Sequence, residues 1–307
     1  MAYHLIYGLL YACSLIPWPV MYLISDLLFL LAYHAAGYRK KVVMANLERA
    51  FPEKTDAERR AIARRFYRNF TDTIVETVKV ISMSDREIAS RFVAKPEMIG
   101  LIEDAVKSGK TYQLHAMHNF NWEIVNLGLS KSLKVPFLGV YMPLRNRNLE
   151  RIFKKIRSRY GTILVPATQF RDRFSEIEKK YEGVPYALAL VADQSPGKPG
   201  NASWLNFFDT PTAFVAGPEK AARERSLGVV FGNFYKVKRG CYTFDAMIAT
   251  EDASLMQEGE LTIAYVRYVE ACIRNRPDNY LWSHRRWKHE YKPEYAGRTL
   301  EPLKNIS

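Results

Sequence analysis

The chain has 307 residues, of which 48% are hydrophobic, so it is long enough to bury a large core, and a disordered or disulfide-framed mini-protein is excluded. Lysine and arginine number 45 against 32 aspartates and glutamates, which favours a polyanionic partner: nucleic acid, anionic lipid, a phosphorylated substrate or an acidic protein. The three cysteines, Cys13, Cys241 and Cys272, lie far apart without zinc-type spacing, which is typical of a reducing compartment.

The first 38 residues are strongly apolar and carry one formal charge, Asp26, before a cationic cluster at residues 39–41. A secretory signal peptide would carry its positive charges before the apolar run, so a membrane anchor fits better. Pro17 and Pro19 divide the run, and the second part reaches only about 25 Å as a helix, short of the ~30 Å hydrocarbon core. We therefore expect a kinked span or an interfacial hairpin, with a buried core helix as the alternative. If the segment spans, the cationic cluster places the remainder in the cytoplasm.

Residues 39–95 are predicted to form a helical lead-in. Thr55 and Glu58 match a capping box, and a long amphipathic helix over residues 56–82 is expected from this cap. Its apolar face is predicted from helical spacing to contain Ile62, Phe66, Phe70, Ile74, Val78 and Ile81. Ser84 and Glu87 predict the cap of a shorter helix.

From residue 96 onward, short apolar runs alternate with polar helical stretches. The runs cover residues 111–117, 134–142, 162–167 and 186–192. Runs that are apolar on both faces and separated by helices predict an α/β fold, with a central, mostly parallel sheet covered by helices on both faces. Residues 228–249 predict an antiparallel hairpin that makes the sheet mixed. The predicted organisation is an anchor at 1–38, a lead-in at 39–95 and a catalytic core at 96–307.

His118 and Glu123 follow the first predicted strand, where α/β sheets present their ligand sites. Five residues along one helix leave two side chains roughly 140° apart, so the pair can meet only if His118 lies in the loop before the helix. Glu123 would then hydrogen-bond one imidazole nitrogen, and the other nitrogen would act as a base toward a substrate hydroxyl.

Two other interpretations of His118 stay open. It could bind a metal with His115 and Glu123, although a strand directs residues i and i+3 to opposite faces, and we predict no metal. It could also be a hydrogen-bonded core histidine. Serine hydrolase elbows, Walker motifs and dinucleotide glycine motifs do not occur in the sequence, which disfavours those classes.

Three further polar groups accompany the predicted sheet. A basic stretch follows the second strand and is either a phosphate clamp or a solvated helix face; it comprises Arg145, Arg147, Arg151, Lys154, Lys155, Arg157 and Arg159. Asp193 ends a buried strand at the edge expected for His118, or is merely a turn residue. Aromatic and cationic residues alternate over 280–288, which suits lipid head-group depth better than stacking on nucleobases, so no nucleic acid is expected.

With these residues in view, the chain resembles the bacterial lipid A biosynthesis acyltransferases, the late lauroyl and myristoyl transferases within the wider glycerolipid acyltransferase group. The sequence HNFNWE at 118–123 is similar to the family's His-x-Gly-Asn-Trp-Glu block, with Phe120 where glycine is usual. Further similar blocks lie, in the family's order, at 46–53, 140–161, 189–197, 204–222 and 276–288.

The resemblance implies transfer of a fatty acyl chain from acyl carrier protein to a hydroxyl of a lipid A-type phosphoglycolipid, without a cofactor, on the cytoplasmic side of the bacterial inner membrane. It implies His118 as the base, Glu123 as its orienting acid and Asp193 as an acid needed for activity. Either Arg157 or Arg159 matches a functional arginine. The remaining residues assigned to substrate binding are Asn121, Arg147, Arg151 and Gln194.

Two rival functions stay open. Phe120 makes the same transfer to another acceptor realistic, such as an aminolipid or a different glycolipid. From another class, the chain would be a membrane-tethered binder of anionic lipid or nucleic acid that performs no chemistry; such a protein leaves the placement of His118 after a buried strand unexplained.

Overall fold

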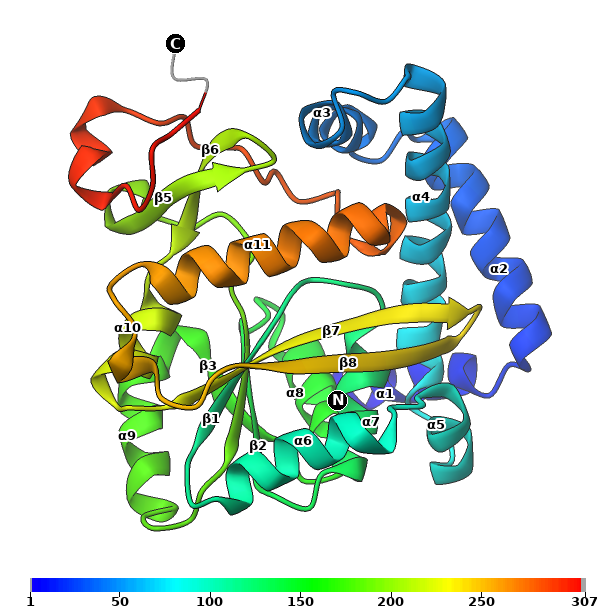
Figure 1. Ribbon diagram of the computed structural model, residues 1–307. Helices are drawn as coiled ribbons and strands as arrows, with labels where there is room; N and C mark the ends of the chain where they lie inside the picture. Colours follow the sequence, from blue (N-terminus) through cyan, green and yellow to red (C-terminus); the bar gives the residue numbers. More distant parts are fainter. Residues whose placement is uncertain (1, 305–307) are drawn as a thin grey trace.

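The computed structural model describes residues 2–304, with the side chains at positions 171, 172, 174 and 178 left out of the description. A six-stranded mixed sheet forms its centre, in the order β3-β2-β4-β1-β7-β8 (Figure 1). These strands are β1 Tyr112–Ala116, β2 Phe137–Tyr141, β3 Ile163–Pro166, β4 Ala187–Val191, β7 Gly228–Lys238 and β8 Cys241–Thr250. The first five are parallel to their neighbours and β8 is antiparallel to β7, as the sequence predicts.

Helices cover both faces of this sheet. The described helices are α1 Ala2–Ser14, α2 Trp18–Leu30, α3 Lys40–Ala50, α4 Asp56–Lys79, α5 Asp85–Arg91, α6 Pro96–Lys107, α7 Trp122–Ser132, α8 Arg147–Arg157, α9 Phe170–Lys180, α10 Gly217–Glu224 and α11 Glu260–Asn275. Alternate side chains of β7 point to opposite faces of the sheet. Val229 and Phe231 pack in a core with α4 and α11, whereas Val230 packs in a core with α6, α7 and α8. The predicted α/β architecture is therefore confirmed.

A small second sheet was not predicted. Its strands β5 (Ala202–Phe207) and β6 (Thr210–Val215) pair antiparallel. Phe208 and Asp209 form the two-residue connection with positive φ angles of 50° and 54°, the backbone of the tight hairpin turns that match strand twist. Short 3-10 turns complete the chain at Ala167–Gln169, Pro199–Asn201, Ala253–Leu255, Pro277–Asn279 and Pro293–Arg298.

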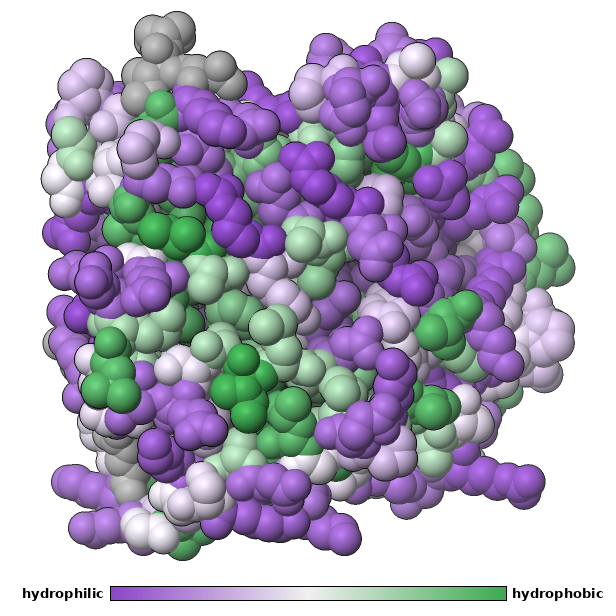
Figure 2. All heavy atoms as spheres, viewed as in Figure 1, coloured by the Kyte–Doolittle hydropathy of each residue, from purple (hydrophilic) through white to green (hydrophobic). Residues whose placement is uncertain are grey.

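The apolar N-terminus forms two helices separated at Pro17, and α2 continues as a π-helical turn over Leu31–Ala35. Within residues 2–304, one helical stretch, Trp18–Ala35, is long and apolar enough to cross a membrane, and only 22% of it is buried. One face of α2 packs along α4 through Met21, Ser25 and Phe29. The opposite face exposes leucines, and apolar surface is visible at the right-hand edge of Figure 2, where α2 lies.

The apolar face predicted for α4 is wrong in its second half. Both capping boxes, at Thr55 and Ser84, are present. Ile74, however, is 43% exposed, whereas Asp72, Glu76 and Lys79 are buried. Polar groups of α2 and of the β7–β8 hairpin bond Asp72 and Glu76, and Lys79 donates to the backbone at the end of α1, so the buried face there is polar.

Candidate active site

His118 lies at the carboxyl end of the sheet, in the loop between β1 and α7. Its side chain is 28% exposed and lines a cavity of about 800 Å³. The segment after α11 holds this loop, because Leu281 N donates to His118 O at 3.1 Å and Phe120 N donates to Asn279 O at 3.2 Å. The predicted position of His118, before rather than within the helix, is confirmed.

Asp193 is the residue that holds the His118 ring. It follows β4, which lies beside β1 in the sheet. Its Oδ1 lies 2.7 Å from His118 Nδ1 and also accepts the His118 backbone N–H at 3.1 Å. Because an ionised carboxylate only accepts, Nδ1 carries the proton and Nε2 is left as the basic nitrogen. Within residues 2–304, Nε2 has no hydrogen-bond partner.

The environment of Asp193 favours its ionised form. Burial of the side chain raises the pKa, but the electrostatic attraction to His118, the hydrogen bonds from its ring and amide and the nearby Tyr280 hydroxyl together hold the pKa of the Asp193 carboxyl below its usual range. The second oxygen, Oδ2, is buried, and no described group reaches it at normal hydrogen-bond length. A fully buried carboxylate paired with one imidazole is an orienting acid for a base.

Glu123 does not contact His118, which corrects the predicted pair. Arg157 takes both of its carboxylate oxygens, with Nε 3.1 Å from each and Nη2 2.5 Å from Oε1, and Trp122 Nε1 donates at 3.1 Å. The reason is geometric: Asn121 caps α7 by accepting the Glu123 N–H at 3.0 Å, so Glu123 already lies on the first turn, facing the end of α8. Glu123 and Arg157 form one wall of the cavity.

The other predicted substrate residues separate into two groups. Arg157 and Gln194 line the cavity. Arg159 bonds Met83 O and Asp85, away from it, so of the two alternative arginines Arg157 is the one at the site. Arg147 is exposed at the start of α8, and Arg151 lies 4.0 Å from the Tyr3 ring centroid; neither lines the cavity. Asn121 is fully buried, with its side chain bonded only to protein groups.

The cavity extends from His118 between α7 and the sheet. Small residues on three strands make room for it: Gly139 on β2 and its register partner Ala189 on β4, and Ala116 two residues further along on β1. Its inner lining is apolar and includes Val125, Leu129, Phe137, Phe234 and Phe244. The lining follows β2 from Phe137 to Tyr141, and its apolar side chains suit a hydrocarbon chain.

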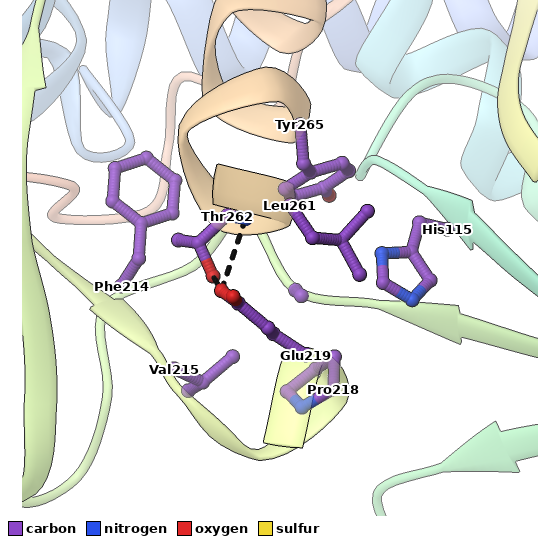
Figure 3. Close-up of a pocket in the computed structure, with 9 residues that line it drawn as sticks. His115, Phe214, Val215, Pro218, Glu219, Leu261, Thr262 and Tyr265 are labelled. Carbon is purple, nitrogen blue, oxygen red and sulfur yellow. Dashed lines mark hydrogen bonds between the residues drawn. The ribbon is translucent and has the colours of Figure 1, made fainter. Parts of the chain in front are cut away.

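A second cavity lies near β1, between α10 and α11, and holds His115 (Figure 3). Its volume is only about 10 Å³, little more than one water. Burial lowers the pKa of His115 to about 3, so the ring is neutral and shares a hydrogen bond with Gln113 Oε1 at 2.7 Å. Glu219 accepts the Gly259 amide at 2.6 Å and both donors of Thr262.

The metal alternative for His118 finds no support in these surroundings. His115 points toward Phe231 and Tyr265, whereas His118 is bonded to Asp193. In the part of the chain that the structure describes, no three His, Cys, Asp or Glu side chains are grouped to hold a metal ion. His115 is thus a hydrogen-bonded core residue.

Sequence reasoning missed several residues that build the site. Tyr280 lies beside Asp193, and Asn279 bonds both the His118 loop and Phe234 O at 2.9 Å. Glu76 accepts a hydrogen bond from Asn121 at 3.0 Å. One signal was available for Glu76: it stands one turn after Asp72 in the middle of a predicted amphipathic helix, where two carboxylates break the apolar pattern.

Comparison with known proteins places this arrangement in a family. The model of the bacterial lipid A biosynthesis acyltransferase family matches residues 1–289. The chain belongs to this family. Among its relatives, the lipid A biosynthesis lauroyltransferase of Escherichia coli K12 is 28% identical over 286 residues, covering 92% of this chain and 89% of the relative. The palmitoleoyltransferase of the same organism and an acyltransferase of Shigella flexneri are each 23% identical over 283 residues, with the same coverage.

Membership of the lipid A acyltransferases makes this chain an enzyme of acyl transfer in lipid A biosynthesis, as the resemblance implies. The match spans the N-terminal helices, the lead-in and the site alike. In this chain the family's His-x-Gly-Asn-Trp-Glu block is residues 118–123, which form the loop after β1 and the start of α7.

Proposed function

We propose that the chain transfers a fatty acyl group from the thioester of acyl carrier protein to a hydroxyl of a lipid A-type phosphoglycolipid, with His118 as the general base. One observation carries the proposal. The free Nε2 of His118, whose Nδ1 is bonded to buried Asp193, stands at a largely apolar cavity of about 800 Å³.

The proposed reaction uses the imidazole twice. Nε2 takes the proton of the acceptor hydroxyl while its oxygen attacks the thioester carbonyl. The resulting tetrahedral intermediate breaks its carbon–sulfur bond, and the imidazolium gives the proton to the departing thiolate, which leaves as the free thiol of the carrier protein. Asp193 keeps the ring oriented and stabilises its positive charge between the two steps. The thioester is already activated, so this scheme calls for no cofactor.

The cavity is proposed to hold the acyl chain with its carbonyl carbon near His118. Its apolar lining favours a hydrocarbon tail, because apolar surface gains about 25 cal/mol per Å² on leaving water. Arg157 keeps Glu123 neutralised at the polar end of the cavity. We propose that the exposed Arg147 and Arg151 on α8 attract the acidic groups of the donor or the acceptor.

The N-terminal helices are proposed to place the site at the cytoplasmic surface of the inner membrane. Asp26 is bonded to Arg239 of the β7–β8 hairpin at 2.7 Å, so the one charge of the apolar segment is paired with a protein group at the surface. The exposed leucines of α2 lie opposite its packed face, which supports a helix lying in the interface rather than one surrounded by lipid. We also propose that the chain divides at residue 38 into a membrane anchor and a catalytic domain.

No specific observation favours either rival function. Phe120 is fully buried against Phe66 and Phe70 and does not line the cavity, so its presence where the family has glycine does not change the cavity lining. A binder without chemistry leaves the His118–Asp193 pair unexplained.

Mass spectrometry of membrane lipids tests the proposed activity. Lipids are extracted from bacteria that lack the protein and from the same strain carrying it. The proposal predicts a phosphoglycolipid whose mass rises by one fatty acyl group only when the protein is present. An increment on an aminolipid would support the rival acceptor, and identical lipid profiles would contradict acyl transfer.

A further inference from the structure

One buried carboxylate, Glu76, joins the N-terminal helices to the catalytic loop. Its Oε2 accepts hydrogen bonds from Asn121 Nδ2 at 3.0 Å and from the Tyr242 hydroxyl at 2.7 Å, and its Oε1 accepts one from the Tyr22 hydroxyl at 3.1 Å. Glu76 itself is fully buried on α4. Helix α2, strand β8 and the start of α7 therefore meet on a single side chain.

Asn121 is the group through which this carboxylate reaches the site. Its Oδ1 accepts the Glu123 N–H at 3.0 Å and caps α7, while its Nδ2 donates to Glu76. The bond to Glu76 thus fixes which side of the amide faces the helix. Asn121 is three residues from His118 and two residues from Glu123, which pairs with Arg157, so a change in its orientation alters both the loop and the cavity wall.

A second carboxylate, Asp72, fixes α2 one turn earlier on α4. It accepts hydrogen bonds from Ser25 Oγ at 2.7 Å, from Arg239 Nη2 at 2.7 Å and from Lys236 Nζ at 3.2 Å. Arg239 also bonds Asp26. Arg91 donates to the Tyr22 hydroxyl at 3.2 Å and to Gly240 O at 3.0 Å, which keeps the phenol in place.

Apolar packing alone could attach α2 to α4, so the buried polar contacts need a further explanation. A buried carboxylate is costly unless donors satisfy it. Burial raises the pKa of Glu76, and the hydrogen bonds from Tyr242 and Asn121 oppose that rise. Loss of the Tyr22 donor leaves Oε1 with no hydrogen bond from the described residues and disturbs the bonds that remain, including the one to Asn121.

We infer that Glu76 is a positioning residue for the proposed acyl transfer, and that through Tyr22 it makes the docking of α2 a condition for the catalytic geometry of the His118 loop. This inference rests on the proposed function. The N-terminal helices then position the active site as well as attach the protein to the membrane.

Tyr22→Phe tests the inference because it removes one hydroxyl and keeps the ring that stacks on Trp18. The full chain is studied in vesicles of anionic and zwitterionic phospholipid. We expect faster hydrogen–deuterium exchange of the amides at 119–124 and a kcat lowered about three- to tenfold, with the KM for the donor unchanged. Tyr7→Phe is the matched control, since it removes a hydroxyl that links α1 to Lys155 of α8 at 3.3 Å without reaching Asn121.

A double-mutant cycle with Asn121→Ala separates coupling from general loss of stability. If Tyr22 acts through Asn121, Tyr22→Phe has little further effect on exchange or kcat once Asn121 is replaced. Additive effects, or wild-type exchange at 119–124 in Tyr22→Phe, would overturn the inference. The exchange experiment needs no turnover, so it remains decisive even if the proposed acyl transfer fails.

Discussion

A single oxygen of Asp193 accepts both the ring Nδ1–H and the backbone N–H of His118, at 2.7 and 3.1 Å. This double contact fixes the loop and the ring together. The tautomer, the ring orientation and the position of the base relative to the cavity therefore depend on one buried carboxylate.

Asp193→Asn is expected to abolish most activity while leaving the fold intact. The amide fills the same volume, but it no longer stabilises the imidazolium and allows the other tautomer of His118. We expect kcat to fall by at least about 100-fold, with the melting temperature within a few degrees of wild type. Initial rates with acyl carrier protein thioester measure this. Asp104→Asn, at an exposed surface pair, is the control, and equal losses in both variants would speak against the assignment.

Glu123→Gln separates the structural pair from the catalytic pair. Its replacement leaves Arg157, whose side chain is only 18% exposed, without its carboxylate, so we expect a loss of about 1–3 kcal/mol in the free energy of unfolding. Adding Arg157→Met should recover part of that loss, because the unpaired charge is then gone. Denaturant unfolding of the wild type and of these two variants measures the losses. A Glu123→Gln variant of wild-type stability whose rate of acyl transfer falls as far as that of Asp193→Asn would instead restore Glu123 as the partner of His118.

The lining of the cavity predicts which variants change the length of the acyl group that the enzyme prefers. Gly139 lines the cavity, and a Cβ there would lie 3.4 Å from Thr162 Cγ2, an ordinary contact. Gly139→Val should fold and narrow the space between β2 and α7, shifting preference toward shorter acyl chains. Competition between donors of different length, read by mass spectrometry of the product, gives the ratio. Gly100→Ala, on an open part of α6, should leave that ratio unchanged; an unchanged ratio in Gly139→Val would place the chain elsewhere.

Two histidines predict how stability depends on pH. Burial holds the pKa of His115 at about 3 and that of His284 at about 4, both below the usual 6.5. Between these values and 6.5 the unfolded chain binds more protons, so the free energy of unfolding falls as the pH falls. Each histidine contributes a slope of up to about 1.4 kcal/mol per pH unit. His115→Gln should remove one such contribution near pH 5 in chemical unfolding, and an unchanged slope would contradict the burial argument.

Local patterns in the sequence predicted much of the fold. The buried runs that became β1 to β4, the β7–β8 hairpin and the two capping boxes all have short-range signals, and the structure contains them. The tight turn at Phe208–Asp209 lacks the usual glycine, which is why β5 and β6 were missed.

The partner of His118 was mistaken for a physical reason. Asp193 is 75 residues away in the chain and reaches His118 because β4 pairs with β1, out of chain order. Spacing along the chain could only suggest Glu123, which is near in sequence but directed to Arg157 by the cap of α7. Likewise, the carboxylates of α4 are bonded to groups of α2 and of the β7–β8 hairpin, and helical periodicity cannot predict such contacts.

His118→Asn, measured in vesicles with acyl carrier protein thioester and a lipid A-type acceptor, tests the central claim most directly. The asparagine amide keeps a donor near the position of Nδ1 for Asp193 and removes the basic Nε2, and Asp104→Asn at an exposed surface pair is the control. We predict a melting temperature near wild type and a rate of acyl transfer lowered about 10²- to 10⁴-fold. Turnover within tenfold of wild type would show that His118 is not the base.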